Sequence, residues 1–209
     1  HPSQAFFAAQ TCLDAGRAAC GELIYDILRE LGPITPAMAV PLYVAVSTDT
    51  GCFQYSNTTA DTHRVAAALM ETGMDVFSLN KRHRTKSWAR LQVERLLTER
   101  MHRYEDGKIA VAPVSLSLMD EAGATEEDME DIAAFLGQIE GVETSVTIRE
   151  LAEGGCKLSV RTSGGLNATK VCARLGGGGH AAAGGCTVSG TLAEAEAAIL
   201  DAIRQVEAG

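Results

Sequence analysis

The stretch RLGGGGHAAAGG, residues 174–185, has the composition of an anion-binding loop. A glycine inside a regular element costs roughly 0.5–1 kcal/mol relative to alanine, so four in succession need a reason other than local propensity. Glycines let backbone N–H groups turn inward and approach an anion in a concave nest, and His180 adds a side-chain donor at its rim. The alternative is a helix C-cap followed by tight packing of small residues, for which one glycine at Gly176 would be enough. We therefore predict an anion site at this run.

Two further residues have side chains suited to phosphate or metal chemistry. Arg161 ends a predicted strand in SVRTSGG, where its guanidinium fork matches phosphate oxygens and Thr162 adds a hydroxyl. A surface salt bridge is the alternative for this arginine. Asp49 follows the apolar run PLYVAV, and carboxylates just past the carboxyl end of a buried strand lie where open α/β sheets bind ligands. A turn or helix cap would explain Asp49 equally well.

The elements expected to position Asp49 are few. Residues 16–31 have the apolar spacing of a helix, and residues 58–73 predict another helix that ends at Gly73. Between them, PLYVAV at 41–46 is predicted as a strand buried on both faces. Helix, strand, loop and helix indicate an α/β parallel sheet, but one strand cannot form a sheet. We therefore expect residues 1–75 to be the end of a larger domain.

The remainder of the chain predicts a second, smaller domain. Residues 76–105 are predicted as a linker region with a helix over 87–104, and residues 106–209 as a complete α+β domain with a mixed sheet. Asn167 is the predicted N-cap of a short helix, and Thr191 with Glu194 forms a capping box before the last one. The predicted strands are 108–116, 144–151, 157–162 and 185–190, with a helix over 125–139.

Composition limits the classes of function. The net charge of −9 argues against a broad platform for long nucleic acid, yet leaves room for a small anionic substrate held by a few donors. No apolar run approaches the ~20 residues that span a bilayer, and the first residues lack the features of a signal peptide. The six cysteines form no C-x-x-C pair. These features predict a cytoplasmic protein that does not enter membranes.

Three segments together resemble the DHH phosphoesterase family, and more closely its nanoRNase/pAp-phosphatase type. They are HPSQ, STDTGCFQYSNTTADTHRVAAALMETG and SVRTSGGLNATKVCARLGGGGHAAAGG, and the resemblance extends over nearly the whole chain. It implies that residues 1–75 are the C-terminal remnant of a parallel-sheet DHH domain and that 106–209 form a DHH-associated domain. The alanyl-tRNA synthetase C-terminal domain resembles the glycine motif too, but it does not predict the D-T-G segment.

The resemblance also implies roles for individual residues. Asp49 corresponds to a metal-binding catalytic aspartate, and His1 to the second histidine of the D-H-H triplet. Arg161 and Thr162 match a substrate-binding S-x-R-S segment, with threonine replacing the second serine. The phosphate-gripping loop corresponds to Gly178, Gly179 and His180. Two manganese ions are the implied cofactors. The other residues of the triplet and the first two family motifs are absent, so we expect the C-terminal two-thirds of an enzyme, inactive as given.

The implied activity is a manganese-dependent phosphodiesterase and phosphatase. Its substrates would be short single-stranded RNA or DNA oligonucleotides and pAp-type 3′-phosphates, and the candidate assembly is a homodimer. Two alternatives stay open: a phosphodiesterase for cyclic-dinucleotide products such as pApA, because the same two-domain plan serves both, and a nucleotide-binding module without catalysis, which the absent metal motifs would suit.

Overall fold

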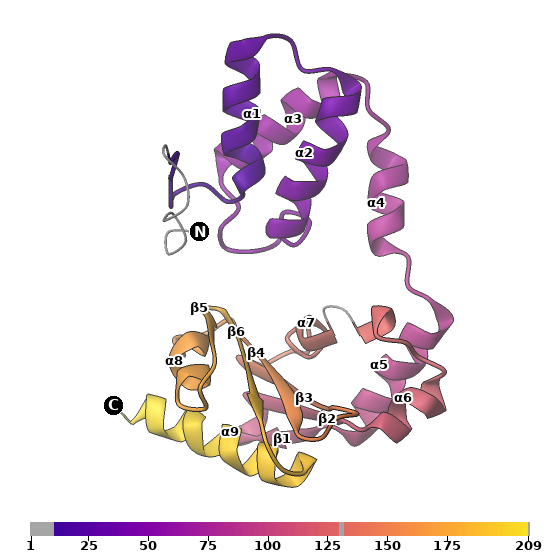
Figure 1. Cartoon of the computed structure of the whole chain (residues 1–209), viewed down its shortest axis with the longest axis vertical. Coiled ribbons are helices and arrows are strands. Elements are labelled where there is room, and N and C mark those ends of the chain that lie inside the picture. Colours follow the sequence, from indigo (N-terminus) through magenta and orange to yellow (C-terminus); the bar gives the residue numbers. More distant parts are fainter. Residues whose placement is uncertain (1–10, 130–131, 209) are drawn as a thin grey trace. The chain divides into compact units, whose positions relative to one another are not determined.

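The chain folds into two units that divide between Thr85 and Lys86 (Figure 1). The structure is a computed structural model, and it describes residues 11–129 and 132–208. The predicted linker region, 76–105, is distributed over both units, because the helix that spans most of its second half packs in the core of the second unit. None of the described helices is long and apolar enough to cross a membrane.

The secondary-structure elements in the described residues of the first unit are all helices. The predicted helices over 16–31 and 58–73 are confirmed, and both contribute to an apolar core that also includes Leu42, Tyr43 and Val46. The C-terminal part of this unit is a short helix that the sequence did not predict. The helices are α1 (Cys20–Leu31), α2 (Pro36–Asp49), α3 (Ala60–Glu71) and α4 (Val76–Arg84).

The predicted strand at 41–46 is wrong, because PLYVAV lies in the middle of α2. The helix begins with Thr35 as N-cap, whose side chain accepts a hydrogen bond from the backbone N–H of Met38, and Pro36 follows in the first turn. A short continuous apolar run has no period that separates a buried strand from a buried helix. The predicted parallel-sheet remnant therefore has no strand in residues 11–85 as the structure describes them.

The second unit is built on one mixed sheet of six strands. Its order is β1-β2-β3-β4-β6-β5, in which only β2 and β3 run parallel. The four predicted strands are confirmed, whereas β1 and β5 were not predicted. The strands are β1 (His102–Tyr104), β2 (Ile109–Val114), β3 (Thr144–Glu150), β4 (Cys156–Thr162), β5 (Gly178–His180) and β6 (Ala183–Val188).

Five α-helices of the described residues accompany this sheet. The predicted 87–104 helix ends at Arg100, since residues 102–104 pair with β2 as β1. In place of one helix over 125–139 there are a 3₁₀ turn at Glu127–Met129 and a helix at 132–136. The caps at Asn167 and Thr191 are confirmed. The helices are α5 (Trp88–Arg100), α6 (Leu116–Ala122), α7 (Ile132–Leu136), α8 (Ala168–Ala173) and α9 (Leu192–Glu207).

The helices divide between the two faces of the sheet. Leu158 and Val160 of β4 belong to the core formed with α8 and α9. Ala110 and Ala112 of β2 belong to the core on the other face, formed with α5, α6 and α7. The α8 helix is the one that packs on β5 and β6, on the same face as Leu158. The opposite face of these outer strands is where the candidate site lies.

Candidate substrate-binding site

The glycine run forms one strand of a β-hairpin at the edge of the sheet (Figure 1). Gly178 pairs with Gly185, Gly179 with Gly184, and His180 with Ala183, so the residues between them, 181–182, form a two-residue turn. The predicted concave nest is therefore wrong as a backbone geometry, because Gly178 to His180 are extended. The chain places these residues by strand pairing.

Gly176 has a purely structural role at the end of α8. Its N–H donates to the Ala173 carbonyl at 3.2 Å, and the N–H of Gly177 donates to the Cys172 carbonyl at 2.8 Å. With its φ of +76°, Gly176 completes the Schellman arrangement that ends many helices. The alternative reading of the sequence, a helix C-cap, is correct for this glycine.

Three further glycines are required by close packing. A Cβ on Gly177 would collide with the Gly185 carbonyl oxygen, and one on Gly179 with the Ala183 carbonyl oxygen. On β6, a Cβ on Gly184 would lie 2.7 Å from both the Ala168 carbonyl oxygen and the Cys172 sulfur of α8. These glycines allow the hairpin and α8 to approach each other at backbone contact distance.

Gly178 differs from its neighbours. A Cβ built there meets no atom within 4 Å, and its φ lies outside the left-handed region. Neither backbone conformation nor packing requires glycine at this position. What the missing side chain provides is open space beside the backbone, on the surface where a ligand could approach.

Strand pairing places the predicted substrate residues on a common face, which we call the shelf. Arg161 pairs with Ala183, which pairs with His180, so these three residues form one row across β4, β6 and β5. Neighbouring strands are about 4.8 Å apart, so the backbones of Arg161 and His180 are separated by roughly 10 Å. The shelf consists of Lys157, Ser159 and Arg161 of β4, Ala183, Gly185 and Thr187 of β6, and Gly178 and His180 of β5.

The turn of the hairpin is held by the residues that follow Arg161. The N–H of Thr162 donates to the Ala182 carbonyl at 2.9 Å, and its hydroxyl donates to the Ala181 carbonyl at 3.3 Å. The N–H of Ala168 donates to the same Ala181 oxygen at 2.8 Å. Thr162 therefore positions the turn next to His180, and its hydroxyl proton is already engaged within the chain.

The shelf lies in a segment without acidic residues. From Lys157 to Ala193 the chain carries Lys157, Arg161, Lys170 and Arg174 but no aspartate or glutamate, although its net charge is −9. This segment therefore adds positive charge and no carboxylate beside the shelf, which favours an anion there. The acid-free stretch is a signal in the sequence that our sequence interpretation missed.

Two buried thiols lie beneath the hairpin, between α8 and β6. Cys172 and Cys186 are in hydrogen-bond contact, which together with burial raises the pKa of the Cys172 thiol. The same hydrogen bond lowers the pKa of the Cys186 thiol. Both are packed in the core face, opposite the shelf, and they contribute to holding the hairpin on α8.

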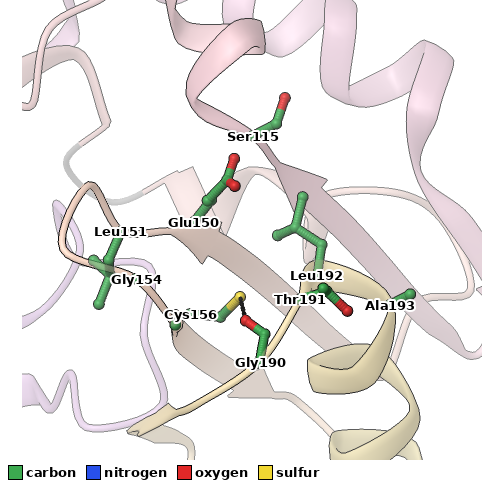
Figure 2. A pocket seen from close by; sticks show the side chains of 10 residues that line it. Ser115, Glu150, Leu151, Gly154, Cys156, Gly190, Thr191, Leu192 and Ala193 are labelled. Atoms are coloured by element: carbon green, nitrogen blue, oxygen red, sulfur yellow. Dashed lines mark hydrogen bonds between the residues drawn. The ribbon is translucent and has the colours of Figure 1, made fainter.

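A cavity of about 530 Å³ lies at the opposite end of β4, where Cys156 begins the strand (Figure 2). Its polar groups already cap helices. The Glu150 carboxylate accepts a hydrogen bond from the Leu116 N–H at 3.0 Å, and Thr191 is the N-cap of α9. Figure 2 shows the Glu150 carboxylate beside Ser115 at this cavity. A carboxylate there repels an anion, so this cavity is a poor phosphate site.

In the first unit, Asp49 is the exposed last residue of α2, and a strained loop follows it. Gly51, Cys52 and Phe53 all have left-handed backbones, with φ of 54°, 56° and 66°. This conformation costs roughly 1–2 kcal/mol for a residue with a side chain. Such strain is often found at functional sites. The Phe53 ring stacks on His63, with 5.3 Å between the ring centroids, which helps to hold the loop.

Asn57 fixes the carbonyl of Asp49. Its side-chain amide donates to the Asp49 carbonyl oxygen and to the Ala18 carbonyl oxygen, both at 3.0 Å. The end of α2 is thereby tied to the segment before α1. Asp49 thus ends a helix, contrary to the predicted position after a strand, and the amide bridge leaves its carboxylate on the surface.

The described residues do not by themselves supply a metal centre. No three histidine, cysteine, aspartate or glutamate residues of 11–129 and 132–208 group together in a way that could hold an ion. His1, which the resemblance assigns to the catalytic triplet, lies outside the described residues. Asp49 alone does not fit the implied two-metal site.

Two known proteins are similar to this chain in sequence over almost its full length. Residues 106–209 match the DHHA1 domain model. The bifunctional oligoribonuclease and PAP phosphatase NrnA of Thermus thermophilus is 34% identical over 98% of this chain and 62% of its own. A probable protein of the same description from Streptococcus mutans is 24% identical over 94% of this chain and 63% of its own. The chain thus spans less than two thirds of the length of these relatives.

A solved structure agrees with the fold. An exopolyphosphatase-related protein of Bacteroides fragilis superimposes with a TM-score of 0.89 at 24% identity, over 96% of this chain and 60% of that one. This likeness extends to the fold, including the helical first unit. The domain match shows a DHHA1 domain over residues 106–209, and the sequence identity to the Thermus relative shows that the chain is similar to NrnA proteins.

Proposed function

We propose that this chain is part of a metal-dependent phosphoesterase that hydrolyses short oligoribonucleotides and pAp-type 3′-phosphates. The observation that carries the proposal is the row of Arg161 and His180 on an acid-free sheet face. The descriptions of the two relatives, oligoribonuclease and PAP phosphatase, support the substrate class.

In this proposal, the second unit binds the substrate phosphate. The Arg161 guanidinium offers a planar fork that can donate two hydrogen bonds to one phosphate. His180 donates a further hydrogen bond through a ring nitrogen, in the neutral or the charged form. Gly178 and Gly179 leave the strand edge beside His180 without side chains, so a phosphate can approach the backbone. Thr162 keeps the turn in place beneath them.

Manganese is the proposed cofactor of the whole protein. Two such ions, when bound, supply a nucleophilic hydroxide at neutral pH and neutralise charge on the phosphoryl oxygens. Asp49 would contribute one carboxylate, at the end of a helix whose position is fixed by Asn57. The remaining ligands would come from outside the residues described above.

A second candidate is a nucleotide-binding module without catalysis. It is favoured by one observation, the lack of a three-ligand group among the residues that the structure describes. The shelf would serve either function equally well, because in both cases its proposed role is to bind phosphate and not to cleave it.

A third candidate is a phosphodiesterase that acts on cyclic-dinucleotide products, and turnover of pApA is its test.

We also propose that the protein acts in the cytoplasm. All six cysteines are free thiols, including the adjacent buried pair Cys172 and Cys186. Adjacent thiols that stay reduced are typical of a reducing compartment.

The proposal is tested by steady-state kinetics of the full-length protein with Mn(II), using pAp, pApA and a ribo-pentanucleotide as substrates. We expect hydrolysis of pAp and the pentanucleotide, with chelator abolishing turnover. Binding of all three substrates without any turnover would overturn the proposed phosphoesterase activity and support the nucleotide-binding module without catalysis. Efficient turnover of pApA alone would assign the dinucleotide activity.

A further inference from the structure

The shelf continues beyond the row of Arg161 and His180, along the length of β4. Residues that alternate along a strand point to the same face, so Lys157 and Ser159 share the face of Arg161. Lys157 pairs with Thr187 of β6 in a row of its own. The side chains of Lys157 and Thr187 are both exposed. The shelf therefore has a cation at each end of its β4 edge.

The part of the shelf between the two cations has few side chains. The middle row consists of Ser159, Gly185 and Gly178, which pair in this order across β4, β6 and β5. Two of the three have no side chain, and Gly185 is exposed. Four residues along a strand span about 13 Å, which is the separation of the Arg161 and Lys157 backbones. Gly185 and Gly178 therefore place no side chain in the path of a linear ligand along this row.

The charges on the shelf have one sign only. Strands β4, β5 and β6 contain Lys157, Arg161 and His180 but no carboxylate. Lys157 has no ion-pair or hydrogen-bond partner among the described residues, unlike Arg149 beside it on β3, which pairs with Glu126. Its ammonium is therefore available to an external anion, at no cost of breaking an internal pair.

From this arrangement we infer that Lys157 and the middle row form a second phosphate subsite, which reads the length of the substrate. This inference rests on the proposed function, in which Arg161 and His180 grip the first phosphate. The ligand class is a linear oligonucleotide whose backbone runs along β4. In pAp a single nucleoside separates the two phosphates, which is too short to engage both ends of the shelf.

The test is the affinity of the full-length protein for a ribo-pentanucleotide and for pAp, measured in EDTA so that no hydrolysis occurs. We expect Lys157→Ala to weaken pentanucleotide binding by about five- to tenfold, typical of one exposed charged contact, and to leave pAp binding within twofold. The slope of log affinity against log salt should fall by about 0.7 for the pentanucleotide only. Lys157→Arg should restore both values.

Lys170→Ala is the matched control. Lys170 is an exposed lysine of the same acid-free segment, but it lies on α8, away from the shelf, and we expect no change in either affinity. Equal pentanucleotide affinity of Lys157→Ala and wild type would overturn the inference, as would an equal loss for pAp. If Arg161→Ala binds pAp like wild type, the proposed function itself fails, and that result is separate from any effect at Lys157.

Discussion

The loop after α2 and the hairpin β5–β6 both carry residues that the sequence assigns to chemistry, but they are built in opposite ways. The hairpin brings Arg161 and His180 into one row through strand pairing alone, entirely within one unit. Asp49 ends α2 just before three left-handed residues, and the Asn57 amide donates to its carbonyl, but no group of three metal-binding side chains exists among the described residues.

The two regions differ because a phosphate site and a two-metal centre require ligands from different amounts of the chain. Phosphate binding needs a few donors on a rigid surface, and one sheet edge can supply them. A two-metal centre needs several carboxylates or imidazoles converging within a few ångströms, which local structure around Asp49 does not provide. Substrate affinity and metal affinity should therefore respond to different variants.

The largest effect is expected at the glycines of the hairpin. Gly177→Val should lower the free energy of unfolding of the second unit by more than about 3 kcal/mol, because its side chain would collide with the backbone of β6. Gly178→Val should unfold at the same urea concentration as wild type, since a Cβ there meets nothing within 4 Å.

Urea denaturation of the two variants measures this difference in stability. The affinity of Gly178→Val for pAp is then measured as a second comparison. Gly178→Val should bind pAp at least tenfold more weakly despite its normal stability, because the new side chain occupies the approach to the shelf. Normal pAp binding by a stably folded Gly178→Val would show that the open space at Gly178 has no role in the site.

The next largest effect is expected for the phosphate donors. Removing a hydrogen bond to a charged group costs about 1.5–3 kcal/mol, so His180→Ala should lower kcat/KM by one to two orders of magnitude, mainly through KM. Arg161→Lys should lower it as well, because an ammonium cannot reproduce the guanidinium fork. Steady-state kinetics measure both, with Mn(II) titration as the control. A loss of Mn(II) affinity in His180→Ala would instead assign this histidine to the metal centre.

A smaller effect is expected at the bridge behind Asp49. Asn57→Ala removes the amide that donates to the Asp49 and Ala18 carbonyls, which should destabilise the first unit by about 1–2 kcal/mol. Mn(II) affinity of the full-length protein should fall while pAp binding in EDTA stays unchanged. Calorimetric titration with Mn(II) and with pAp tests this separation. If pAp binding fell in parallel, the two regions would not be independent.

The smallest effect concerns acid stability of the second unit. Hydrogen bonds from the backbone and side chain of Thr191 lower the pKa of Glu194 below its usual 4.5. Because the folded-state pKa is the lower one, this contribution to stability is present above pH 4.5 and disappears as the pH falls through the folded-state pKa. At pH 7, Glu194→Gln should therefore unfold at a lower urea concentration than wild type. Below the folded-state pKa of Glu194, the variant and the wild type should unfold at the same urea concentration. A difference that persists in acid would exclude the capping charge as its cause.

Much of the second unit follows from local sequence signals. The strands β2, β3 and β4 are rich in the β-branched residues that predict strands, and Asn167 and Thr191 cap their helices as predicted. Capping depends on side chains and N–H groups within one turn, so the sequence alone determines it. The assignment of Arg161 and His180 to a phosphate site was made from residue type and from the family resemblance, and it stays a prediction.

Other features were decided only by the tertiary structure. PLYVAV has no period, so whether it became a strand or a helix depended on the helices α1 and α3 that surround it. The reasons for the glycines depend on their neighbours: Gly176 ends a helix, Gly177 touches backbone, and Gly178 faces open space. No local rule separates these three adjacent positions. The rows of the shelf likewise exist only because β6 lies between β4 and β5, which fixes Arg161 and His180 on one face.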